Sequence, residues 1–328
     1  MVTKQYSELN SDHYSALHKG VQLVLSPDLE GQAQRIWISS GVTRAATMSG
    51  HRSYAPNAFI PQPPWRLPNS SEYQLLCADN SQANPLGWQL GSFIGVCRIP
   101  DPVLAPLITI LEKLEPATLS RQHFLERLQS PENKQAILPI IQFLHRYFLF
   151  PHQPKLLGFY LKQPGLETST ATLAQLQPPG QAIDPDQVVY VGMHLDSWEL
   201  APVEQRHRSR NRLCINLGRE DRFFLFINLT LKDLSDALNP LEVKNDPNGV
   251  RLGELFMQRY PSYPVVKLKV APGEAYIAPT DNLIHDASSI DKQQIDLTMT
   301  LLGYFGLPFV MNRRVLLDVV TGNVWSSS

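Results

Sequence analysis

The second half of the chain consists of short apolar runs, many of them rich in β-branched or aromatic residues, separated by Pro, Gly, Asn and Asp. Runs of this length and composition are typical of β-strands. We expect strands over residues 157–162, 188–194, 212–217, 223–231, 265–270, 274–279, 297–304 and 315–320, and one helix over about 247–259. The chain from about residue 156 onward is therefore predicted to be rich in β-structure.

The first half of the chain differs in amino-acid composition from the second. Residues 1 to about 70 are rich in Ser, Asn, Gln and Pro, so we expect irregular structure there with some short strands. A first helix is predicted to start at Asp101, because apolar residues follow it at helical spacing. A second is predicted from Ser130, a capping residue, to about Phe150, where Pro151 would end it. We expect residues 1–150 to be an N-terminal elaboration whose helices pack on a catalytic core formed by residues 151–328.

Three residues are candidate metal ligands. His194 and Asp196 end the apolar run 188–193, and residues two apart on a strand point to the same face, so both side chains can hold one ion. His285 follows the predicted strand 274–279, and the roughly 90 residues between the two sites leave room for several strands to bring them together. A structural pair of histidines is the alternative reading of this pattern.

Two histidines and one carboxylate on one side of an ion form the ligand set of non-heme Fe(II) oxygenases, which keep the opposite positions free. Eight short strands that carry such a site predict an α+β fold: a double-stranded β-helix, that is, a cupin-like jelly roll, with flanking helices.

Composition excludes several other classes. A formal net charge of −1 argues against a general nucleic-acid or membrane-surface binder. No signal peptide and no apolar stretch of about 20 residues is present, and the three cysteines lack metal-binding spacing, so we expect a cytoplasmic protein with free thiols. The sequence contains neither a phosphate-binding glycine loop nor a Gly-x-Ser-x-Gly motif, which leaves nucleotide and hydrolase chemistry without support.

The motif His194-Leu195-Asp196 followed by His285 resembles the Fe(II)- and 2-oxoglutarate-dependent oxygenases of the cupin and jelly-roll superfamily. The segment 272–279 also resembles the second cupin motif, in which a Gly-led strand precedes the last histidine. The resemblance covers roughly residues 185–320. It implies that His194, Asp196 and His285 bind iron and act in catalysis, that 2-oxoglutarate is the co-substrate, and that a small-molecule substrate is oxidised by dioxygen. Because Asp196 is present, hydroxylation is expected rather than halogenation.

One feature of the family is missing. Many members carry an Arg ten to fifteen residues beyond the last histidine, where it pairs with the far carboxylate of 2-oxoglutarate, but residues 286–296 contain none. A branch of the superfamily has a basic residue on a strand after the first motif, and Arg222 or Arg212 would fit that pattern. For Arg222, pairing with Glu220 or Asp221 at the surface is the alternative. Tyr276 and Asn216 are further candidates to contact the co-substrate.

The sequence therefore predicts an Fe(II)- and 2-oxoglutarate-dependent dioxygenase that hydroxylates an unactivated carbon of a small molecule, such as an amino acid or a biosynthetic intermediate. Two alternatives remain: an iron oxygenase that does not use 2-oxoglutarate, and a non-catalytic cupin-like binding protein.

Overall fold

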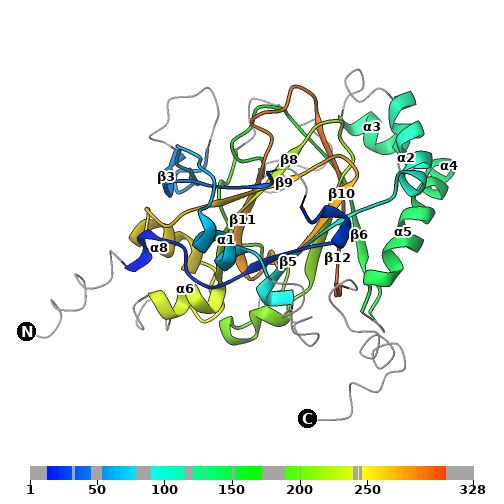
Figure 1. The fold of residues 1–328 in the computed structure, drawn as a ribbon. Coiled ribbons are helices and arrows are strands. Elements are labelled where there is room, and N and C mark those ends of the chain that lie inside the picture. Colours follow the sequence, from blue (N-terminus) through cyan, green and yellow to red (C-terminus); the bar gives the residue numbers. More distant parts are fainter. Residues whose placement is uncertain are drawn as a thin grey trace, which may run out of the picture.

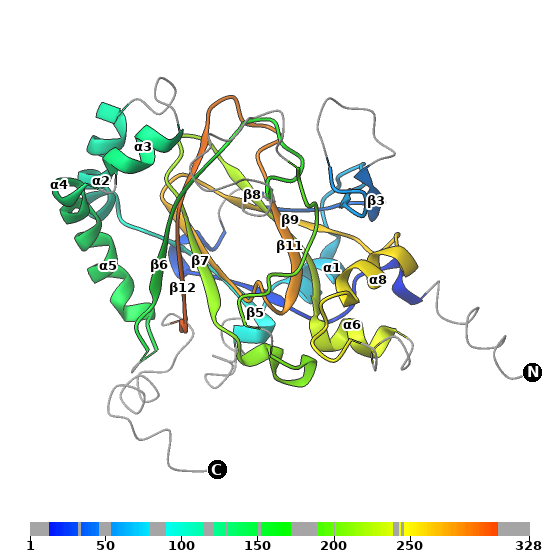
Figure 2. The same ribbon diagram turned by 180° about the vertical axis from the view of Figure 1, so that it is seen from behind.

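The structure is a computed structural model in which helices and several sheets are combined (Figures 1 and 2). It describes residues 13–31, 34–45, 54–78, 90–114, 121–128, 130–149, 152–171, 189–199, 201–238, 243 and 246–307. The strand predicted over residues 315–320 lies outside these residues.

The larger sheet has six strands in the order β1-β5-β10-β7-β12-β6 among the described residues. β1 runs parallel to β5, and the other neighbours are antiparallel. The strands are β1 (Gln22–Leu25), β5 (Phe93–Arg98), β6 (Lys155–Lys162), β7 (Asn211–Asn216), β10 (Glu274–Ala278) and β12 (Asp296–Gly303).

The smaller sheet has four strands in the order β11-β8-β9-β2, all antiparallel, in the same part of the chain. They are β2 (Ile36–Ile38), β8 (Arg222–Thr230), β9 (Val266–Val270) and β11 (Leu283–Ser288), and a separate hairpin joins β3 (Val42–Arg44) to β4 (Phe59–Pro61). The N-terminal part of the chain thus extends both sheets through β1, β5 and β2.

Six predicted strands are confirmed to within two residues, namely β6, β7, β8, β9, β10 and β12. The prediction for 188–194 was wrong in form, because the described part of that segment makes only isolated bridges at Tyr190 and His194. β11 was not predicted at all: its sequence Leu-Ile-His-Asp-Ala-Ser lacks the apolar continuity of its neighbours.

The helices of the N-terminal half are α1 (Ser70–Leu76), α2 (Asp101–Leu114), α3 (Arg121–Leu128), α4 (Pro131–Lys134) and α5 (Leu138–Leu144). Short 3-10 turns include η4 (Leu90–Ser92), η5 (Gln135–Ile137) and η6 (His145–Tyr147). The single helix expected from Ser130 to Phe150 is instead a succession of α4, η5, α5 and η6. Ser130 does accept a hydrogen bond from the Asn133 backbone, but Pro139 cannot donate one and marks a new helix start.

The C-terminal half contains η8 (Val203–Arg208), α6 (Leu231–Ala237) and α8 (Leu252–Arg259), and α8 corresponds to the helix expected over 247–259. No helix of the described residues combines the length and the apolarity that crossing a bilayer requires.

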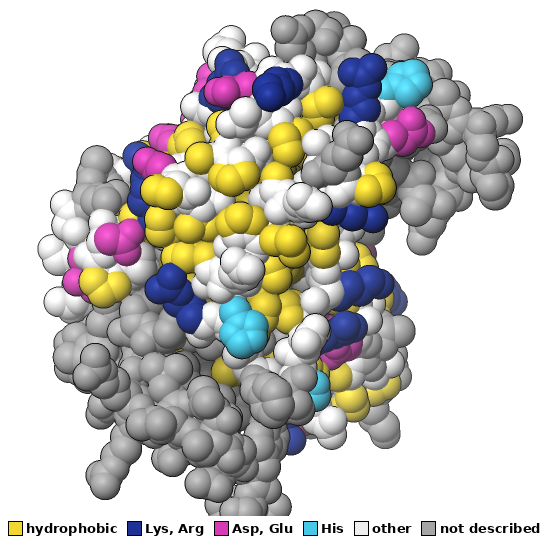
Figure 3. Space-filling view, turned by 90° about the vertical axis from the view of Figure 1, so that its right-hand side faces the viewer, with side chains coloured by type: hydrophobic (Ala, Val, Ile, Leu, Met, Phe, Trp, Pro, Cys, Tyr) yellow, Lys and Arg dark blue, Asp and Glu magenta, His cyan; other side chains and the backbone are white. Residues whose placement is uncertain are grey.

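The two faces of the larger sheet are buried differently. Phe159, Leu213 and Met299 point to one face and pack with Leu107 of α2 and Ile140 of α5 in one core. The helices therefore cover this outer face, and their side of the molecule shows a broad hydrophobic area (Figure 3). Residues that alternate with these, among them Cys214 and Tyr276, belong to a second core with Phe224 and Phe226 of β8. The inner face of the larger sheet thus turns toward the smaller sheet.

Candidate metal centre

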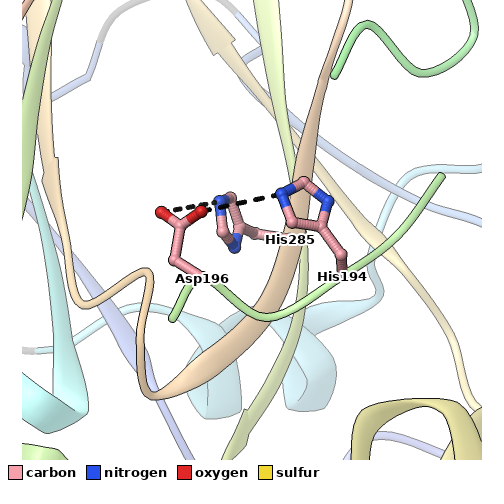
Figure 4. Close-up of side chains that lie close together, drawn as sticks. All are labelled: His194, Asp196 and His285. Atoms are coloured by element: carbon pink, nitrogen blue, oxygen red, sulfur yellow. Dashed lines mark ion pairs between the residues drawn. The ribbon is translucent and has the colours of Figure 1, made fainter. Parts of the chain in front are cut away.

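His194, Asp196 and His285 meet between the two sheets, with one ligand atom of each within 4.8 Å of the others (Figure 4). Nε2 of His194 lies 3.7 Å from Oδ1 of Asp196, and Nε2 of His285 lies 3.7 Å from Oδ2 of the same carboxylate. The imidazole rings are 4.7 Å apart between centroids. The three side chains that the sequence singled out are therefore brought together from positions far apart in the chain.

His194 is fixed by its backbone and by a turn before it. Its N–H donates to the His285 carbonyl at 3.0 Å, and the His285 N–H donates back at 2.8 Å. Gly192 precedes it with φ +72°, and a Cβ at Gly192 would lie 2.3 Å from the Phe59 carbonyl oxygen. Only glycine fits that approach without strain. Nδ1 of His194 lies 2.8 Å from the Gly192 carbonyl oxygen, and in the neutral tautomer that donates to this oxygen Nε2 keeps a lone pair for a metal. Burial alone would lower the pKa of His194, but the carboxylates of Asp196 and Asp286 raise it above its ordinary value.

His285 lies inside β11, opposite Phe226 of β8, and is 2 % exposed. Nδ1 faces the Leu283 carbonyl oxygen at 3.3 Å, and Nε2 has no hydrogen-bond partner. Burial lowers the pKa of His285 to about 3, so the ring is neutral near pH 7. A buried, neutral imidazole with an unused nitrogen is a ready metal ligand.

Asp196 reaches the site by a route that strand alternation did not predict. Residues 195–196 have left the bridge at His194, and the Asp196 N–H donates to the Thr280 carbonyl at 3.0 Å. Its Oδ2 forms an ion pair of 2.7 Å with Nη2 of Arg212. Burial alone would raise the pKa of Asp196, but the positive charge of Arg212 outweighs burial and holds it well below its usual value. The carboxylate is therefore ionised.

These features fit a divalent cation. Two imidazole nitrogens and an ionised carboxylate face one point, and the exposed fractions of the His194 and Asp196 side chains, 20 % and 11 %, leave one side open. Nitrogen and oxygen donors in this two-to-one ratio are the set that non-heme iron enzymes use. Asp286 lies on the Nδ1 side of His194, with its Oδ2 3.8 Å from that nitrogen. The Oδ1 atom of Asp286 accepts hydrogen bonds from Ser169 and Thr170.

Two of the four predicted co-substrate contacts line the inner face near this centre. Arg212 lies on β7 beside Asp196, and its guanidinium is 5.7 Å from the ring of Trp198. Tyr276 on β10 stacks on Phe224 at 4.3 Å between centroids, and Phe224 in turn lies 5.8 Å from the His285 ring. Arg212 therefore contacts the triad directly, whereas the Phe224 side chain lies between Tyr276 and His285.

Arg222 is fully buried at the start of β8. Nε lies 3.4 Å from Oδ2 of Asp296, and Nη1 donates to Sγ of Cys214 at 3.0 Å. The surface pairing considered for Arg222 is not observed, since Glu220 accepts hydrogen bonds from residues 293 and 294, and Asp221 pairs with Lys269. Burial opposes the charge of Arg222, but Asp296 outweighs it and raises the pKa.

Asn216 lies farther along β7, where its side chain serves the backbone. Its Nδ2 donates to the carbonyls of Val270 and Glu220, and its Oδ1 accepts from the Gly218 N–H. These bonds hold the turn before β8, and no contact links Asn216 to the triad.

Sequence reasoning missed two charged residues of this interior, Asp296 and Lys162, which are register partners on β12 and β6. A signal was present, because Lys162 ends one predicted apolar strand and Asp296 directly precedes another, and an unpaired charge at the end of a buried strand would be costly.

No family model and no curated protein matches this sequence. Among solved structures, the chain is similar to crystal structures of the Kdo hydroxylase KdoO, described as a non-heme Fe(II) α-ketoglutarate-dependent dioxygenase. The cobalt(II) complex is 14 % identical with a TM-score of 0.36 and covers 74 % of this chain and 91 % of that chain. The complex with α-ketoglutarate and Fe(III) is 13 % identical with a TM-score of 0.35 and covers 72 % and 88 %.

Proposed function

We propose that this chain is a mononuclear non-heme Fe(II), 2-oxoglutarate-dependent dioxygenase that hydroxylates an unactivated carbon of a small molecule. The observation that carries the proposal is the convergence of Nε2 of His194, Nε2 of His285 and a carboxylate oxygen of Asp196 on one point. Iron with 2-oxoglutarate would supply the oxidation there: dioxygen is consumed, the 2-oxo acid loses carbon dioxide to give succinate, and a substrate C–H becomes C–OH.

We further propose that residues 151–328 form a double-stranded β-helix and residues 1–150 an elaboration of it. The order of the strands supports this. β6, β12, β7 and β10 are neighbours in one sheet, while the bridge at His194, β11, β8 and β9 are neighbours in the other. Along the chain these strands alternate between the sheets except at the β8–β9 pair, which is the winding of a jelly roll.

The protein's own residues have separate tasks in this proposal. His194 and His285 would offer imidazole nitrogens to the metal, and Asp196 a negative charge that Arg212 partly balances. The aromatic pair of Phe224 and Tyr276 closes the interior behind His285 and keeps water out. Arg222, as predicted, would attract the far carboxylate of the co-substrate from the same interior.

A small pocket beside the triad marks the proposed substrate side. Its lining includes Asp196 and the adjoining Leu195 and Ser197, together with Leu231 and Val250. A pocket that contains a metal ligand in its wall can present a substrate carbon to the open side of the metal.

The test is an anaerobic titration of the Fe(II) protein with 2-oxoglutarate, because bidentate chelation gives a visible charge-transfer band. The expected result is a saturable band, and succinate formation coupled to oxygen uptake when oxygen is admitted with substrate. His194→Ala and Asp196→Ala should abolish both. Oxygen uptake without a band would favour an iron oxygenase that does not use 2-oxoglutarate, and failure to bind metal would favour a binding protein.

A further inference from the structure

The Trp198 side chain is 46 % exposed, although it follows the proposed metal ligand Asp196 by only two residues. Its indole ring lies 5.7 Å from the guanidinium of Arg212, and Arg212 in turn forms the 2.7 Å ion pair with Asp196. The side chains of Arg212 and Asp196 are themselves 19 % and 11 % exposed. The exposed surface therefore leads from the indole ring, over Arg212, to the triad.

A single exposed aromatic ring is common on protein surfaces, so the meaning of Trp198 depends on the turn that carries it. Asp281 is 1 % exposed, and its carboxylate accepts hydrogen bonds from the backbone N–H groups of Trp198 at 3.3 Å and Glu199 at 2.8 Å. The carbonyl of the preceding residue, Thr280, accepts a hydrogen bond from the Asp196 N–H at 3.0 Å. One segment of the chain thus fixes the backbone of the metal ligand and the backbone of Trp198 relative to each other.

Arg206 holds the same turn through the Glu199 carbonyl. It is 2 % exposed, and its Nη1 donates to that carbonyl at 2.9 Å and lies 3.6 Å from Oδ2 of Asp281. A buried ion pair adds little net stability, because taking both charges out of water costs about as much as their attraction returns. The effect of the pair of Arg206 and Asp281 is therefore to fix the shape of the turn, which holds Trp198 at the surface beside the triad.

The charged side chains next to Trp198 are already paired. Arg212 pairs with Asp196, and Arg210 pairs with Glu199. The indole ring therefore offers a flat apolar surface with little net charge around it. Such a surface stacks on an aromatic or other flat apolar group, whereas an ionic group would find its counter-ions already engaged.

We propose that Trp198 determines substrate specificity by stacking on an aromatic or other flat apolar group of the substrate. This inference rests on the proposed function and narrows its small-molecule substrate to compounds that carry such a group. With the group on the indole ring, a carbon attached to it can reach the open side of the metal, because only Arg212 separates the ring from Asp196.

The experiment uses two probes: benzyl alcohol, which is an aromatic ring with one attached carbon, and propane-1,2-diol, which is polar and has no ring. Mn(II) bound at the triad broadens the NMR lines of a probe that binds near it, so the broadening reports both the affinity and the place of binding. The wild-type Mn(II) protein should broaden the lines of benzyl alcohol far more than those of the diol.

Trp198→Ala should lower the affinity for benzyl alcohol roughly 2- to 10-fold, the range for the loss of one aromatic pair, and Trp198→Phe should retain most of it. The matched control is Tyr73→Ala, because Tyr73 is an aromatic residue of α1 with nearly the same exposure, 47 %. This control should leave the affinity unchanged.

Equal broadening of benzyl alcohol by the wild-type protein and by Trp198→Ala, or a diol that binds as well as benzyl alcohol, would overturn the assignment. The same comparison by saturation-transfer NMR on the metal-free protein tests the stacking without the metal. Failure of Mn(II) to bind would refute the proposed function, while a loss of saturation transfer in Trp198→Ala would still support stacking at Trp198.

Discussion

Nη2 of Arg212 lies 2.7 Å from Oδ2 of Asp196, the same carboxylate oxygen that faces Nε2 of His285 at 3.7 Å. Arg212 therefore fixes both the charge and the direction of a proposed metal ligand. It is a positioning residue, because it acts on the metal through Asp196.

Replacing Arg212 by Met is expected to weaken Co(II) binding about 10- to 100-fold, the usual effect of losing a partner that orients a metal ligand. Titration followed by Co(II) absorption measures the change. Arg210→Met is the control, since Arg210 pairs with Glu199 and not with the triad, and it should leave the affinity nearly unchanged. Equal affinities of the two variants would contradict a role for Arg212 at Asp196.

The buried group around Asp296 predicts a pH-dependent stability. Asp296→Asn leaves Arg222 and Lys292 without their carboxylate, which should cost about 3–5 kcal/mol in free energy of unfolding near pH 7. Asp221→Asn, at an exposed ion pair, should cost less than about 0.5 kcal/mol.

The sign of the pH dependence follows from the pKa of Asp296. Burial raises this pKa, but the positive charges of Arg222 and Lys292 lower it by more than burial raises it. The pKa of Asp296 therefore lies below the usual 3.8. The stabilisation is complete above the unfolded pKa and is lost as pH falls through the folded one. Denaturant unfolding at several pH values should therefore show the gap between wild type and Asp296→Asn closing below about pH 3.8. A gap that stays constant there would refute the ion-pair account.

Gly192→Ala should disturb His194 as well as the fold. A Cβ there would meet the Phe59 carbonyl oxygen at 2.3 Å, in addition to the cost of a positive φ. We expect a loss of at least about 2 kcal/mol and weaker Co(II) binding. Gly31 has a nearly identical φ of +71° and open space around it, so Gly31→Ala should cost only about 1 kcal/mol and leave Co(II) binding intact. Thermal unfolding with and without Co(II) separates the two effects.

Most strands could be predicted from the sequence because their apolar residues form short, recognisable runs. In β7 and β12, for example, residues alternate between the helix-covered face and the interior, and apolar residues recur on the helix-covered face. β11 was missed because His285, Asp286 and Ser288 face polar partners that are distant in the chain, such as Ser169 and Leu166. The polar residues of β11 are there because the strand forms part of the site, and for that reason its sequence alone does not predict a strand.

The triad was predictable as a set of residue types, although the reason given for His194 and Asp196 was incomplete. Their common direction comes from a backbone bridge to His285 and a hydrogen bond to Thr280, not from strand alternation. The partner of Arg222 could not be foreseen, because Asp296 is more than seventy positions away and meets it only through the pairing of the sheets. Local charges at Glu220 and Asp221 were the nearer but wrong candidates.

The central claim is that three side chains hold one divalent cation, and the most direct measurement is a crystal structure of the protein with Zn(II), which is redox-inert. The anomalous signal should give one strong peak about 2.0–2.2 Å from Nε2 of His194, Nε2 of His285 and a carboxylate oxygen of Asp196. A peak bound by other residues, or none between the sheets at saturating Zn(II), would contradict the account.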